Sequence, residues 1–179
     1  MKHRTGRRLA AATLIILTAA AWTRAAAQTT VVILVRHAEQ ETGQDPALSA
    51  IGRARADSLL RAVQNAGIAA IYHTALRRTT ETAKAVADAI GVTPTVLTIR
   101  PGEAVPDHAA EVAADILARH RGRTVLVVGH SNTVPVIISA LGVPMTDAPR
   151  ISDTEYFHFF TVIIPAGGEA RLIRSRYGG

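Results

Sequence analysis

The chain has 179 residues, a net charge of +6 and no cysteine. Without cysteine it can form neither disulfides nor cysteine-based nucleophiles and zinc sites. The positive charge is concentrated in residues 1–27, which hold five of the 20 basic residues and none of the 14 acidic ones. The other 15 basic residues nearly balance the acidic ones, which argues against a nucleic-acid partner.

Residues 1–27 have the pattern of a secretory signal peptide. Basic residues come first, an apolar stretch occupies positions 9–22, and Ala25-Ala26-Ala27 supplies small residues for cleavage. The apolar stretch is shorter than the ~20 residues that a membrane-spanning helix needs. We therefore predict cleavage before Gln28 and a periplasmic or secreted protein with no stable membrane association. A retained N-terminal anchor is the alternative, and N-terminal sequencing of the exported form separates the two.

The rest of the chain alternates strands and helices. Strand patterns occur at 30–36, 69–72, 94–98 and 124–128, and helix patterns at 49–65, 76–90, 107–119 and from Ser131 or Asn132 onward. Two late runs, at 156–164 and 170–176, straddle Gly167-Gly168 and predict a β-hairpin. We expect residues 28–179 to form one domain, a three-layer α/β/α sandwich with a mainly parallel central sheet and a C-terminal β-hairpin.

Two histidines stand directly after the two strongest strand patterns. His37 follows a β-branched run that ends at Arg36, and His130 follows a second run that ends at Gly129. Ligand sites in open α/β sheets form just beyond the carboxyl ends of the strands. The two side chains are therefore expected to converge on one ligand.

Four sequence blocks carry a resemblance to a known family. They are Leu34-Val35-Arg36-His37-Ala38-Glu39, the segment 45–56 with Leu48-Ser49 and Gly52, the segment 74–83 with Arg78, and the segment 129–135 with His130. The first resembles the Arg-His-Gly/Ala signature of the histidine phosphatase superfamily, which has the phosphoglycerate-mutase-like fold. The others resemble, in the same order, its loop-to-helix, arginine and second-histidine blocks. The compact chain is similar to the small phosphohistidine-phosphatase-like members.

This resemblance implies a phosphatase that needs neither metal nor cofactor. It implies that His37 is the nucleophile and that Arg36, Arg78 and His130 form the phosphate pocket. The chemistry suits these residue types, because a neutral imidazole can accept a phosphoryl group and an arginine donates to phosphate bidentately while remaining charged. The helix expected after His130 would add backbone N–H groups.

The proton donor for the leaving group has several candidates. Mutase-type relatives carry a glutamate in an insertion that this chain lacks, and acid-phosphatase-type relatives carry an aspartate at the position of Ser131. Glu103 is our preferred acid, with Asp107 and His108 as alternatives, and Ser131 is assigned to substrate binding. Three other residues are placed near the pocket, namely His73 before the arginine block and Asp153 and Glu155 before the late strand.

These observations predict a phosphatase that hydrolyses small phosphomonoesters or phosphoramidates through a phosphohistidine on His37. A mutase is disfavoured because holding the phosphoenzyme while substrate turns calls for a covering lid. One alternative is a non-catalytic phosphate-binding module of the same fold, which would form no phosphoenzyme. A metal-dependent hydrolase would be inhibited by a chelator, but the sequence has no close-spaced ligand cluster. The physiological substrate and the oligomeric state stay open.

Overall fold

The computed structural model describes residues 28–178, so the predicted signal peptide lies outside the described residues. The elements in chain order are β1 (Thr30–Arg36), α1 (Ala50–Val63), β2 (Ile68–His73), α2 (Arg77–Ile90), β3 (Thr95–Val96), α3 (Val105–Arg119), β4 (Thr124–Gly129), α4 (Val134–Ala140), the 3-10 helix η1 (Met145–Asp147), β5 (His158–Ile164) and β6 (Arg171–Arg176). None of the described helices has the length and apolar character needed to cross a membrane.

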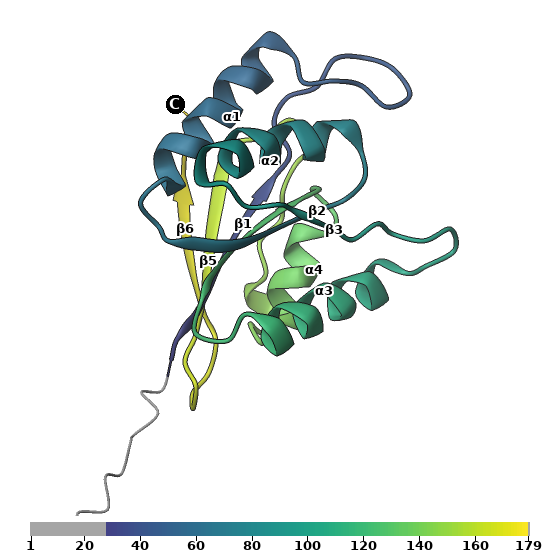
Figure 1. The fold of residues 1–179 in the computed structure, drawn as a ribbon. Coiled ribbons are helices and arrows are strands. Elements are labelled where there is room, and N and C mark those ends of the chain that lie inside the picture. The colour runs from purple at the N-terminus through teal and green to yellow at the C-terminus, as the bar shows by residue number, and fades with distance from the viewer. Residues whose placement is uncertain (1–27, 179) are drawn as a thin grey trace, which may run out of the picture.

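The strands form one six-stranded sheet in the order β3-β2-β4-β1-β5-β6. β1 to β4 are parallel to one another, whereas β5 runs antiparallel to β1 and β6 antiparallel to β5. Figure 1 shows the β5–β6 hairpin, in yellow, at one edge of the sheet. The predicted α/β fold, with a mainly parallel sheet and a C-terminal hairpin, is confirmed.

Helices cover both faces of the sheet because alternate strand residues are apolar on both sides (Figure 1). On one face, Val32 and Leu34 of β1 pack in a core with apolar residues of α3 and α4. On the other face, Ile33 and Val35 pack in a second core with α1 and α2. The central strand is therefore buried from both sides.

Two of the predicted helix boundaries have clear local causes. Ser49 caps α1, since its hydroxyl accepts a hydrogen bond from the N–H of Gly52 at 3.1 Å. Gly91 ends α2 in the left-handed conformation, with φ of 69°. Gly52 also allows a close approach, because a Cβ there would collide with the backbone carbonyl of Glu39.

Several boundaries differ from the prediction. The last helix begins at Val134 rather than at Ser131 or Asn132, because the N–H groups of Thr133 and Val134 both bond to the carbonyl of His130 and form a turn first. β3 is only two residues long, and α3 begins at Val105, where Pro106 occupies the first turn. The helix-terminus N–H groups expected directly beside His130 are thus displaced by one turn.

Candidate active site

The strands β1 and β4 bring the two predicted histidines together. Their parallel register pairs Arg36 with Gly129, so that His37 and His130 leave the sheet at the same level. The backbone N–H of His37 extends the ladder by bonding to the carbonyl of Gly129 at 2.9 Å. The two imidazole rings lie with their centroids 5.4 Å apart. The predicted convergence is therefore present in the structure.

Within residues 28–178, His37 has one ring nitrogen that forms a hydrogen bond and one that does not. Its Nδ1 lies 2.8 Å from the carbonyl oxygen of Ala38, and a carbonyl can only accept, so the ring hydrogen is on Nδ1. Nε2 is consequently the nitrogen with an available lone pair. The turn is fixed by the N–H of Ala38, which donates to the hydroxyl of Thr82 on α2 at 2.9 Å. The side chain is thus oriented as a nucleophile requires.

His130 is held by a chain of threonine hydroxyls. Its Nε2 lies 2.9 Å from Oγ1 of Thr74, which in turn lies 2.9 Å from Oγ1 of Thr79. Thr79 donates its one hydroxyl hydrogen to main-chain carbonyls, so the Thr74 hydroxyl donates to Oγ1 of Thr79 and accepts from the Nε2–H of His130. That arrangement places the ring hydrogen of His130 on Nε2. On the backbone side, the N–H of His130 donates to the hydroxyl of Thr133 at 2.9 Å.

Arg36 is buried under the loop that precedes β5. Its Nη1 donates to the carbonyls of Ser152 at 2.8 Å and Glu155 at 3.3 Å. The guanidinium also lies over the ring of Tyr156, at 4.2 Å from the centroid, and Nη2 is 3.4 Å from the tyrosine hydroxyl. Arg36 therefore orders this loop as well as lying beside His37.

Arg78 supplies the second cation from the first turn of α2. Its Nη1 lies 4.0 Å from Oδ1 of Asp45, a carboxylate that also accepts from the backbone N–H of Arg77. Within the described residues, Nε of Arg36 and Nε of Arg78 are both buried and have no hydrogen-bond partner. Buried donors normally have a partner. Two such donors beside two histidines suit an anion with several acceptor oxygens.

Glu103 does not contact the residues that converge. Its carboxylate accepts from the backbone N–H and the guanidinium of Arg100, at 2.7 and 2.9 Å. These hydrogen bonds lower the pKa of Glu103, which favours the carboxylate over the acid. Asp107 is exposed in the first turn of α3. The role of Glu103 as general acid stays a prediction that no contact in this structure supports.

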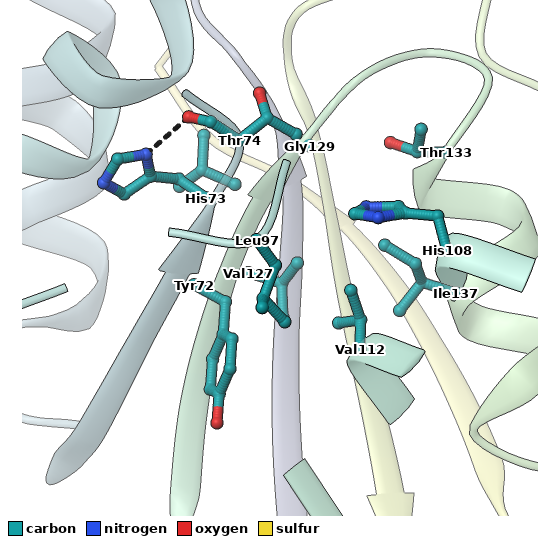
Figure 2. Close-up of a pocket in the computed structure, with 11 residues that line it drawn as sticks. Tyr72, His73, Thr74, Leu97, His108, Val112, Val127, Gly129, Thr133 and Ile137 are labelled. Carbon is teal, nitrogen blue, oxygen red and sulfur yellow. Dashed lines mark hydrogen bonds between the residues drawn. The ribbon is translucent and has the colours of Figure 1, made fainter. Parts of the chain in front are cut away.

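His73 and His108 line a small cavity together with Thr74, Gly129 and Thr133 (Figure 2), and neither His37 nor His130 is among its lining residues. His108 enters this cavity from α3 and is only 3% exposed, and desolvation lowers its pKa. His73 bonds through Nδ1 to the carbonyl of Thr74 at 2.6 Å. The cavity has a volume of about 10 Å³, which is too small for a phosphorylated substrate.

Ser131 and Asp153 meet at the exposed side of the site. The Ser131 hydroxyl donates to Oδ1 of Asp153 at 3.0 Å, and the same Oδ1 lies 3.9 Å from Nη2 of Arg36. Glu155 turns away from the pocket, since it accepts from the N–H of Ser152 at 2.9 Å and lies 3.3 Å from Nε2 of His158. Of the two acidic residues expected near the pocket rim, Asp153 is the one whose carboxylate approaches a pocket cation.

Burial keeps both histidines neutral at pH 7. Desolvation, together with the charges of Arg36 and Arg78, lowers the pKa of His37 from 6.5 to about 4. Desolvation, the neighbouring His37 and the same arginines lower the pKa of His130 to about 3. A neutral His37 has the lone pair that an attack on a phosphoryl group requires.

The neutral histidines should make the fold less stable in mild acid. An unfolded histidine takes up a proton near pH 6.5, whereas folded His37 does so only near pH 4, so stability falls as pH decreases between these values. His37 alone should lower the free energy of unfolding by about 2 kcal/mol between pH 7 and pH 5. Urea unfolding at the two pH values measures this. The decrease in the free energy of unfolding should be smaller in His37→Asn than in the wild type. An equal decrease in both proteins would contradict the conclusion that folded His37 is neutral at pH 5.

Several supporting residues are absent from the sequence prediction. Thr79 and Thr82 follow Arg78 on the buried side of α2, and their spacing of three is the local signal that could have identified them. Tyr156 and the Ser152 carbonyl reach Arg36 from a loop without any regular pattern. Within residues 28–178, no three histidine, aspartate or glutamate side chains come together in a group that could hold a metal ion.

The comparison with known proteins agrees with this geometry. The sequence model of the histidine phosphatase superfamily (branch 1) matches residues 32–102, which include Arg36, His37 and Arg78. No curated protein matches the chain in sequence.

Solved structures share the fold at low sequence identity. A mycobacterial glucosyl-3-phosphoglycerate phosphatase is 16% identical with a TM-score of 0.65 over 85% of this chain and all of its own, and its phosphate complex is also similar. Bacillus stearothermophilus YhfR is 21% identical (TM-score 0.62, 80% and 95% covered). An Entamoeba histolytica phosphoserine phosphatase, solved with 3-phosphoglyceric acid, is 16% identical (TM-score 0.61, 84% and 97% covered). The family match covers residues 32–102, which is less than half of the chain, and the solved structures share its fold, so the chain is similar to histidine phosphatase superfamily proteins in both respects.

Proposed function

We propose that the protein is an exported, metal-independent phosphatase that hydrolyses small phosphomonoesters or phosphoramidates through a phosphohistidine on His37. The observation that carries this proposal is the state of His37: Nδ1 is bonded to a carbonyl, Nε2 is free, and a pKa of about 4 keeps the ring neutral. Fixed cations beside a neutral nucleophile are what phosphoryl transfer requires. The predicted signal peptide at 1–27 supports export.

The reaction proceeds in two displacements. Nε2 of His37 attacks phosphorus, the bond from phosphorus to the leaving oxygen or nitrogen breaks, and the phosphoryl group remains on the histidine. Water then attacks phosphorus, the P–N bond breaks, and inorganic phosphate leaves. In both steps, Arg36 and Arg78 neutralise charge on the non-bridging oxygens, and the ring of His130 lies beside that of His37. The similar phosphatases solved with phosphate or with 3-phosphoglyceric acid support a phosphorylated small molecule as substrate.

The binding-module alternative shares the cations but not the nucleophile. A module that only holds phosphate would gain nothing from a histidine whose Nε2 is free and unprotonated, and a charged ring would bind the anion better. Burial has the opposite effect on His37, because it removes the positive charge. The electrostatics of the pair therefore favour turnover over simple binding.

The direct test is hydrolysis of 4-nitrophenyl phosphate by the purified protein in the presence of EDTA. We expect multiple turnovers at a rate that added Mg²⁺ or Zn²⁺ does not raise. A protein that binds inorganic phosphate but releases no nitrophenol would support the binding module instead. Activity that EDTA removes and a metal restores would contradict the metal-independent mechanism.

A further inference from the structure

The leaving group needs a proton that His37 and the two pocket arginines do not supply. Expulsion of an alkoxide from an alkyl phosphate is slow unless a proton arrives as the P–O bond breaks, and a positioned general acid typically contributes about 10²–10⁴-fold. Such an acid has to stand opposite the nucleophile, because the attacking and leaving atoms are in line. Since His37 and Arg36 are buried at the base of the site, the leaving group must face the exposed side.

Asp153 is the carboxyl group at that exposed side. Its side chain is 91% exposed, yet Oδ1 lies 3.0 Å from the Ser131 hydroxyl and 3.9 Å from Nη2 of Arg36. Ser131 directly follows His130 in the chain. Asp153 is thus held between the residue next to the second histidine and the cation next to the nucleophile.

The loop that carries Asp153 has a defined position. Arg36 binds the carbonyls of Ser152 and Glu155, on either side of Asp153. Within the loop, the Ser152 hydroxyl lies 3.1 Å from that of Thr154, and the N–H of Ser152 donates to the Glu155 carboxylate at 2.9 Å. A phosphate bound to Arg36 would therefore lie close to the Asp153 carboxyl group.

The other carboxylates around the site already serve as structural acceptors. Glu39 binds Arg55, and Glu81 accepts from the backbone of Leu48 and from Arg77. Asp45 accepts from the N–H of Arg77 at the start of α2, and Glu103 is bound to Arg100.

Two acidic residues of the described chain contact a pocket cation through the carboxylate, namely Asp45 at Arg78 and Asp153 at Arg36. Of these two, Asp153 is the one that accepts no hydrogen bond from a backbone N–H.

We propose that Asp153 is the proton donor to the leaving group and that Ser131 orients its carboxyl group. This inference rests on the proposed phosphatase function. In the first step Nε2 of His37 forms a bond to phosphorus while the carboxyl proton of Asp153 passes to the leaving oxygen. In the second step the Asp153 carboxylate takes a proton from the attacking water as the P–N bond breaks. Inorganic phosphate leaves, and both His37 and Asp153 return to their starting states.

The test compares Asp153→Asn with the wild type on two substrates. With 4-nitrophenyl phosphate, whose leaving group needs little assistance, we expect kcat/KM to fall by less than about 10-fold. With glycerol 2-phosphate, which needs a proton, we expect a fall of about 10²–10³-fold. Ser131→Ala should show a smaller loss with the same dependence on the leaving group.

Two controls separate this role from a structural one. Asp147→Asn removes a carboxylate from the neighbouring 3-10 helix and should leave both rates unchanged. Inhibition by inorganic phosphate should be no weaker in Asp153→Asn, because the substitution removes a negative charge near Arg36. Equal losses on both substrates together with weaker phosphate inhibition would overturn the proposal, as would a leaving-group-dependent loss in Glu103→Gln but not in Asp153→Asn.

The outcome can be distinguished from failure of the proposed function. One outcome is that the wild type hydrolyses aryl phosphate while Asp153→Asn has the same kcat/KM as the wild type on both substrates. That result would support the proposed phosphatase function and show that Asp153 is not the proton donor. If the wild type hydrolyses neither substrate and forms no phosphohistidine, the proposed function itself fails.

Discussion

Replacing His37 by asparagine is expected to lower kcat/KM for 4-nitrophenyl phosphate by more than about 10³-fold, since loss of a nucleophile costs far more than loss of one binding contact. Asparagine is close to histidine in size and can still donate to the Ala38 carbonyl, so the turn after β1 should persist. The variant therefore removes Nε2 with little change in the pocket. Circular dichroism and thermal melting check that the fold is retained.

The phosphoryl group itself reports which histidine reacts. Brief incubation with ³²P-labelled substrate and an alkaline quench should trap one label per wild-type chain, and none in His37→Asn. His120→Asn, at the end of α3 beside Tyr72, is a matched control and should label normally. A label that persists in His37→Asn, or that lies on His73 or His108, would contradict the assignment of the nucleophile.

Replacing Arg78 by alanine is the second large effect that we expect. Arg78 points inward, and its buried Nε has no partner within the described chain, so its contribution should be to bound phosphate. Loss of a charge-stabilising donor of this kind lowers turnover by about 10²–10³-fold. Inhibition by inorganic phosphate should weaken at the same time, because the cation binds product and transition state alike.

The adjacent Arg77 provides the control for this experiment. It lies in the same helical turn but is 60% exposed, and it pairs with Glu81 at 2.7 Å. An exposed pair of this kind contributes about 0–1 kcal/mol to stability, so Arg77→Ala should leave kcat/KM within about two-fold. An equal decrease in kcat/KM in the two variants would indicate a general effect of α2 or of the overall charge. It would contradict the assignment of Arg78 to the phosphate pocket.

The sequence predicts the part of the site that regular structure positions. His37 and His130 each follow a buried strand, and two parallel neighbouring strands end at the same edge, so their convergence follows from the pattern alone. Arg78 comes instead from the resemblance of segment 74–83 to the family's arginine block, and the structure places it in the first turn of α2, just after β2. Ser49 and Gly91 mark helix ends through chemistry that is local in sequence.

The contribution of the loop before β5 could not be predicted in the same way. Ser152 bonds to Arg36 from 116 positions away, and the segment has no period that would fix its direction. Asp153 therefore looks, in sequence, like one of several carboxylates close to the pocket. Glu103 looks equally suitable, and only the structure reveals that it is bound to Arg100. The turn at 131–133 is a further example. The hydroxyl of Thr133 accepts a hydrogen bond from the backbone N–H of His130 in the segment where the sequence predicts the start of a helix.

The place of β1 in the sheet has a consequence for the order of folding. β1 is the first strand of the described chain, but both of its neighbours come from much later segments, β4 at Thr124–Gly129 and β5 at His158–Ile164. Strand pairs of such large sequence separation form slowly, because the intervening loop must be closed first. The strand that presents the nucleophile is thus synthesised early, but it pairs with its neighbours late. The site can assemble only when nearly the whole chain is available.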